Sequence, residues 1–173
     1  MENEEIEYLQ PTKFWRIASL KENWAHLSDE VDEFLEVALP CLRKQQKGTR
    51  PTSDEMNAAA MELADIQIMC NTIIQMLDEC PVKEKDLPQR YMACPNFSEQ
   101  IMILLETKAK ASSEAKAIIR GVTAYSDNLA GELVKVIFAA EAAMMWIYET
   151  RENRDEIRKM AYLKNKKRGY YEL

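Results

Sequence analysis

The sequence is poor in the residues that form turns and in the residues that bind transition metals. Among its 173 residues there are only four glycines, six prolines and one histidine. So few turn residues disfavour an all-β fold and favour long helices. A single histidine excludes a ferritin-like di-iron bundle, which needs two Glu-x-x-His motifs. Because no two cysteines have C-x-x-C spacing, we expect reduced thiols of a cytoplasmic protein, not zinc ligands or disulfides, at Cys41, Cys70, Cys80 and Cys94.

Three further absences exclude classes of function. The formal net charge is −6, which argues against a general nucleic-acid-binding protein. No apolar run is long enough to span a membrane. The acidic segment 1–5 has no apolar core behind it, so we do not expect a signal peptide. Hydrophobic residues make up 47% and charged residues 30% of the chain, a balance typical of one folded domain over residues 1–173.

Apolar residues that recur with helical periodicity predict an all-α bundle of about five to six helices. Thr12, Ser28 and either Thr52 or Ser53 are placed to cap helices at their N-termini. Three prolines predict a linker over residues 81–96 with at most a short helix inside. The predicted helices are about 12–24, 28–42, 52–80, 97–119, 126–150 and 151–167.

Two pairs of carboxylates fall on or beside helix faces that should be buried. Glu62 shares an apolar stripe with Ile66, and Asp65 lies one step to the side. Earlier in the chain, Glu30 and Glu33 lie along the edge of another apolar stripe. A bare buried carboxylate is costly, so it must be neutralised, paired with a cation or bound to a metal. If the two helices are antiparallel, the four acids face one another and form a site for a hard cation.

A shift of 70 residues aligns two parts of the chain without a gap and predicts an internal duplication. Repeat one covers about residues 12–80, repeat two covers about 97–150, and a basic C-terminal helix or tail covers 151–173. The architecture expected is therefore two degenerate helix pairs in one domain. The second repeat has lost three of the four acids, because Glu30, Glu33 and Asp65 are replaced by Gln100, Ile103 and Lys135, and only Glu132 remains.

The spacing of the acids resembles a family signature. Glu30-x-x-Glu33 is followed, after 28 intervening residues, by Glu62-x-x-Asp65. This pattern resembles that of the MazG-like all-α NTP pyrophosphatases, a superfamily that also contains dimeric dUTPases, dCTP pyrophosphatases and phosphoribosyl-ATP pyrophosphatases. The family pattern usually begins with two glutamates, and Asp29 stands here in place of the first. Residues 162–168 resemble the Lys/Asn/Arg-bearing tail of phage and bacterial members.

The resemblance implies a hydrolase that converts a nucleoside triphosphate to the monophosphate and pyrophosphate, with Mg²⁺ or Mn²⁺ as cofactor. Oxygen ligands and bridging to phosphates suit Mg²⁺. The resemblance also implies a homodimer. The roles it implies are metal ligands at Glu30, Glu33, Glu62 and Asp65; a general base at Asp29 or Glu33; phosphate contacts from Lys164, Asn165 and Arg168; and base contacts from Trp24 and His26.

Each of these features also has a structural interpretation. Acids commonly lie at the solvated edges of helical bundles, and Glu62 is then paired with an arginine or lysine. Trp24 is then a core residue, His26 a surface residue, and the basic tail a solvated helix end. The alternative function is a catalytically silent helical protein of the same fold that binds nucleotides or a partner.

Overall fold

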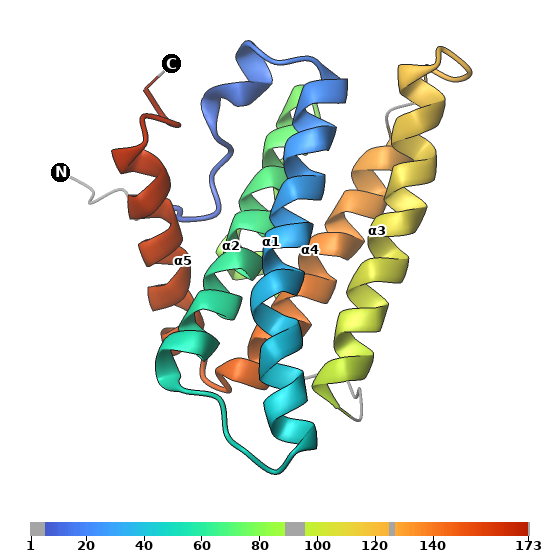
Figure 1. The fold of residues 1–173 in the computed structure, drawn as a ribbon. Helices are drawn as coiled ribbons and strands as arrows, with labels where there is room; N and C mark the ends of the chain where they lie inside the picture. Colours follow the sequence, from blue (N-terminus) through green and yellow to red (C-terminus); the bar gives the residue numbers. More distant parts are fainter. Residues whose placement is uncertain (1–5, 89–95, 125–126, 173) are drawn as a thin grey trace, which may run out of the picture.

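The structure is a computed structural model that describes residues 6–88, 96–124 and 127–172, and these residues form helices and loops only. The all-α prediction is confirmed (Figure 1). None of the described helices has the length and apolar character that crossing a membrane requires. The elements are the 3-10 helix η1 (Lys13–Arg16), α1 (Leu20–Gln46), α2 (Ser53–Met76), the 3-10 helix η2 (Glu84–Asp86), α3 (Phe97–Ile119), α4 (Asp127–Ile147) and α5 (Arg151–Lys167).

The first long helix differs from the two helices predicted there. A capping box starts α1, in which Ser19 accepts from the backbone of Glu22 and Glu22 accepts from the backbone of Ser19. Ser28 is not a cap, because its hydroxyl donates to the carbonyl of Trp24, 3.0 Å away, inside the continuous helix. Thr12 precedes only the short helix η1 and makes no side-chain cap. The break that we predicted before Ser28 is therefore wrong.

The remaining helices lie close to their predicted positions. Thr52 is the cap of α2 and forms a capping box with Glu55, but α2 ends at Met76, before the predicted stop at Cys80. Helices α3 and α5 have the predicted bounds, and α4 begins at Asp127. Ser126, the predicted start of α4, lies outside the described residues, as do Cys94 and part of the predicted linker. The described part of that linker contains η2.

Helix α2 is the central element of the bundle. It packs against α1, α4 and α5, while α3 packs mainly against α4 (Figure 1). Every residue from Leu63 to Ile74 is buried, so α2 has no solvated face over this stretch. The pairs α1–α2 and α3–α4 meet through α2 and α4. At this contact the amide of Gln67 donates to the carbonyl of Ile137, the residue 70 positions later, at 3.2 Å. The duplication itself stays a prediction.

Buried polar side chains of α2 hold the segments before α1 and after α2. The amide of Asn71 donates to the carbonyls of Leu9 and Val82, both at 2.8 Å, and its oxygen accepts from the amide of Val82 at 2.9 Å. The hydroxyl of Thr72 accepts from the backbone of Thr12 at 3.0 Å. The bonds to Leu9 and Thr12 are buried, so losing one of them would leave an unpaired polar group in the core. They fix the N-terminal segment beside α2.

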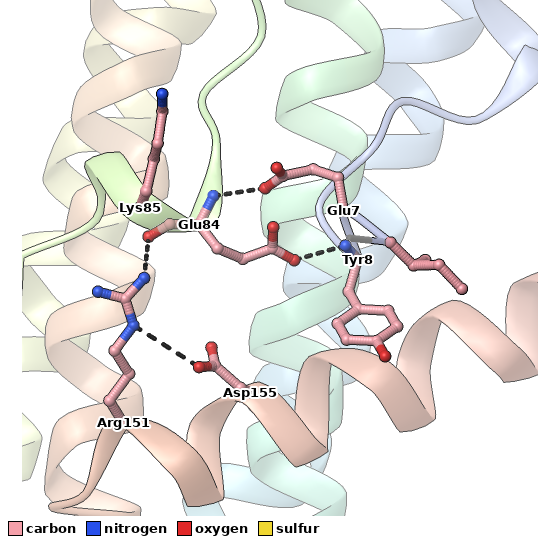
Figure 2. A pocket seen from close by; sticks show the side chains of 7 residues that line it. Glu7, Tyr8, Glu84, Lys85, Arg151 and Asp155 are labelled. Atoms are coloured by element: carbon pink, nitrogen blue, oxygen red, sulfur yellow. Dashed lines mark hydrogen bonds and ion pairs between the residues drawn. The ribbon is translucent and has the colours of Figure 1, made fainter. Parts of the chain in front are cut away.

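A second set of bonds fastens the same N-terminal segment to η2. The carboxylate of Glu84 accepts from the backbone of Tyr8 and Leu9, and the backbone of Glu84 donates to Glu7 (Figure 2). Arg151, at the start of α5, donates to the carbonyl of Glu84 at 2.8 Å. These groups line a pocket of about 350 Å³. Since most of its charged groups bind the backbone or, like Arg151 and Asp155, each other, we interpret this pocket as a structural junction.

A buried ion network joins α4 to α5. The carboxylate of Glu141 accepts from Arg154 at 2.8 Å and from Arg158 at 2.6 Å, and all three side chains are about 1% exposed. Gln67 of α2 also donates to Glu141, at 3.1 Å. Arg154 donates in addition to the carbonyls of the last residues before α5. Most of the charged groups of this network are thus hydrogen-bonded, as buried charges require, although Nε of Arg158 has no partner among the described residues.

We predict that Glu141→Gln destabilises the fold by about 3–5 kcal/mol, because it leaves two buried arginines without their shared counter-charge. Urea unfolding followed by circular dichroism measures the loss. The matched control is Glu132→Gln in the same helix, whose ion pair with Lys135 is partly solvated. That variant should lose at most about 1 kcal/mol. Equal losses in the two variants would contradict the prediction.

Candidate metal centre

The packing of α1 against α2 brings three of the four predicted acids together. Glu62 and Asp65 lie three positions apart in α2, so they share one side of that helix, and Glu30 of α1 faces them. Each of the three offers an oxygen, and these oxygens all lie within 4.8 Å of one another. We call Glu30, Glu62 and Asp65 the acid cluster. Oxygen-only donors from two rigid helices suit a hard divalent cation.

Asp65 is the most buried member of the acid cluster, with 3% of its surface exposed. Helix α5 supplies both of its partners. Lys164 donates to one carboxylate oxygen, and the amide of Asn165 donates to the other at 2.8 Å. Burial raises the pKa of Asp65, although the charge and hydrogen bond of Lys164 oppose this shift. Two residues predicted to contact phosphate thus converge on the acid cluster.

Glu62 is the member of the acid cluster that lacks a partner. Its oxygen Oε2 is buried and has no hydrogen-bond partner within the described part of the chain. Burial raises the pKa of Glu62 to about 7, against the pull of Lys164, and the nearby charges of Asp65, Glu30 and Glu33 raise it further. An unpaired buried carboxylate oxygen is costly. A bound cation would relieve this cost.

Glu30 has a different partner. His26, one turn earlier in α1, lies with Nε2 at 3.1 Å from a carboxylate oxygen of Glu30. This hydrogen bond raises the pKa of His26, and burial opposes the shift. The imidazole also packs edge-on to Phe14 and Tyr170, with ring centroids 5.4 and 6.4 Å away. His26 therefore contacts both a predicted metal ligand and the aromatic rings of Phe14 and Tyr170.

The other predicted site residues lie outside the acid cluster. Asp29 and Glu33 are exposed on α1, although the charge of Glu33 acts on Glu62. Trp24 is buried in the core at 8% exposure, with the ammonium of Lys108 5.6 Å from its ring centre, so it offers little surface to a ligand. Arg168 is exposed at the C-cap of α5.

Sequence reasoning missed the tyrosines of the tail. Gly169 has a φ of 79°, and the backbones of Gly169 and Tyr170 donate back to α5 in a Schellman-type turn. This turn brings the residues after α5 against η1, where Lys13 donates to the carbonyl of Tyr170 at 2.8 Å. The hydroxyl of Tyr171 is buried without a partner in the described residues, and burial and then the charge of Asp65 raise its pKa. The one sequence signal was a glycine followed by two tyrosines.

The second half of the chain has no comparable set of acids among the described residues. Glu132 pairs with Lys135 at 2.7 Å and, like Glu62, has a buried oxygen Oε2 without a partner there. Gln100 donates to the carbonyl of Ala139 at 3.2 Å, and Ile103 is 38% exposed. Glu132 is therefore a natural control for Glu62.

Comparisons with known protein families, with curated proteins and with solved structures find no match to this chain.

We predict that Glu62→Gln raises the melting temperature of the metal-free protein at neutral pH and not in acid. The folded protein holds the Glu62 proton up to a pKa of about 7, whereas the ordinary value is 4.5. Ionising Glu62 therefore costs nothing below the ordinary value and progressively more as pH rises from 4.5 to about 7. Thermal melts in a chelator, across this interval, measure the difference between variant and wild type. A difference that stays constant with pH would refute the assignment.

Proposed function

We propose that this chain is a Mg²⁺-dependent nucleoside triphosphate pyrophosphohydrolase, which produces a nucleoside monophosphate and pyrophosphate. One observation carries the proposal. Three carboxylates from two helices converge within 4.8 Å, and the cationic end of a third helix reaches the same point. Phosphoryl chemistry needs both a divalent cation and further positive charge close to it.

The residues present fit a divalent cation. The donors are all carboxylate oxygens, which Mg²⁺ and Mn²⁺ accept, and Glu62 has an oxygen that no residue in the described chain satisfies. Glu30, Glu62 and Asp65 would hold the ion. When bound, it supplies charge neutralisation for the phosphates and lowers the pKa of a coordinated water. Glu33 is exposed one turn after Glu30 and lies outside the acid cluster, so its role as a fourth metal ligand stays a proposal.

Other residues would bind and orient the substrate. Lys164 and Arg168 lie one turn apart on α5 and supply positive charge for phosphate oxygens, while the neutral amide of Asn165 holds Asp65 in place. His26 orients Glu30 through its hydrogen bond. Asp29 and Glu33 are the candidates for the general base, because both are exposed beside Glu30 and are free to meet a water. Cleavage would fall at the α–β phosphoanhydride.

We predict that Glu62→Gln lowers pyrophosphate release from a panel of deoxynucleoside triphosphates by about 100-fold or more, because it removes a ligand charge. The matched control is Glu132→Gln, which changes the same residue type with a similar orphaned oxygen in the other half of the chain. That variant should keep most of the turnover. Steady-state assays in Mg²⁺ measure both variants, after circular dichroism has shown each to be folded.

Two results would contradict the proposal. Comparable losses of turnover in the two folded variants would show that Glu62 has no special role. Wild-type protein that binds Mn²⁺ and nucleotide but releases no pyrophosphate from any substrate would favour the alternative, a silent nucleotide-binding protein. The homodimer also stays a prediction, which light scattering of the purified protein tests.

A further inference from the structure

The ion pair between Lys164 and Asp65 links the acid cluster to α5. Lys164 is the only lysine or arginine, among the described residues, that pairs with a member of this cluster. We propose that Lys164 is an exchangeable internal counter-ion, which occupies the place of the cation at Asp65 and leaves when a divalent ion binds. The inference rests on the proposed function and adds a mode of regulation to the same site.

The acid cluster needs a positive charge even without a metal. Asp65 is 3% exposed, and its neighbours Glu30 and Glu62 are also acids. Without a counter-charge, three carboxylates with oxygens within 4.8 Å of one another would repel each other strongly in a poorly solvated site. Lys164 donates to Asp65 and is also attracted by Glu62. The lysine therefore does electrostatically what a bound cation would do.

The ammonium and a divalent ion exclude each other at Asp65. An ion that takes one oxygen from each acid would lie beside the ammonium of Lys164. The positive charges of the ion and the ammonium would then repel each other. Asn165 differs, because its amide is neutral and binds the other oxygen of Asp65. We expect the amide to stay on Asp65 when the metal binds, while the ammonium departs.

Lys164 is placed to move. Its side chain is 26% exposed, whereas Asn165 beside it is 5% exposed. A lysine has a flexible four-carbon stem, so its ammonium can swing without any movement of the helix. The charge of Arg168, one turn further on, repels that of Lys164 and favours its departure once Asp65 is taken.

The exchange couples metal binding to anion binding. An ammonium released from Asp65 is free to pair with a phosphate, so metal and phosphate should each raise the affinity of the site for the other. A lysine permanently paired with Asp65 would add nothing to the coupling that a metal ion beside a phosphate gives by itself. The reactivity of the Lys164 amine reports which of these states is populated.

The first experiment measures Mn²⁺ affinity by electron paramagnetic resonance of the free ion. Lys164→Met removes the internal competitor and should tighten Mn²⁺ binding by about tenfold or more, because the wild-type site is mostly occupied by the ammonium. The matched control is Lys167→Met, which removes one charge from an exposed position in the same helix. It should change the affinity by less than about twofold. Equal effects in the two variants would overturn the inference.

The second experiment uses the wild-type protein and therefore does not depend on how Lys164→Met folds. Acetic anhydride labels lysine amines, and mass spectrometry of peptides quantifies labelling at Lys164 and, as control, at Lys167. Labelling of Lys164 should be slow in a chelator, faster in Mn²⁺, and slow again in Mn²⁺ with pyrophosphate. Labelling of Lys167 should stay constant. A Lys164 rate that Mn²⁺ leaves unchanged would overturn the exchange.

Mn²⁺ binding by Glu62→Gln distinguishes failure of the Lys164 exchange from failure of the proposed function. If wild-type protein binds Mn²⁺ and Glu62→Gln does not, the metal centre stands and the labelling result alone decides the role of Lys164. If Glu62→Gln binds Mn²⁺ as tightly as wild type does, the acid cluster is not the metal centre and both proposals fall.

Discussion

The complete burial of α2 is the constraint on which the rest of the structure depends. From Leu63 to Ile74 no side chain of α2 has a solvated face, yet this stretch carries four polar residues. A buried polar group must find a partner inside the protein. Together the four bind every neighbouring part of the chain except α1 and α3: Asp65 binds α5, Gln67 binds α4, Asn71 binds Leu9 of the N-terminal segment and Val82 of the linker, and Thr72 binds Thr12 of the N-terminal segment. The apolar residues drive association, and these polar residues specify which segment lies where.

Helix α5 shows how strongly charge governs this arrangement. Its N-terminal half is fixed by Arg154 and Arg158, which share Glu141 of α4. Its C-terminal half is fixed by Lys164 and Asn165, which share Asp65 of α2. Two buried carboxylates on two different helices therefore set the position of α5 at both of its ends. Ion pairs of this kind add less stability than apolar packing would, but they tolerate few alternative arrangements.

The fold was largely predictable because its helix signals are local. Asn96 and Thr150 cap α3 and α5, and both helices have the predicted bounds. Ser28 misled the prediction, because the same hydroxyl that caps a helix also bonds to a carbonyl four residues back when the helix simply continues. Local sequence does not distinguish these two uses.

The candidate site was predictable in its acids but not in the environment of each acid. Helical spacing placed Glu62 and Asp65 on one side of α2, but it did not predict that Asp65 would be nearly inaccessible and Glu33 exposed. Those outcomes depend on how α1 and α5 lie against α2. The partners of Asp65 come from 99 and 100 residues later in the chain. Periodicity within one helix holds no information about such contacts.

The two halves of the chain differ in how they neutralise their acids. Glu132 pairs with Lys135, which stands one turn later in the same helix where the 70-residue shift aligns Asp65. That pair forms whenever α4 is helical, so its charge is neutralised locally. Around Glu62 the same position holds a second acid, and the neutralising lysine comes from another helix through a side chain that is partly exposed. A counter-charge supplied from outside the helix can be withdrawn without unfolding it. Among the described residues, the acid cluster with an excess of negative charge therefore lies in the first half of the chain.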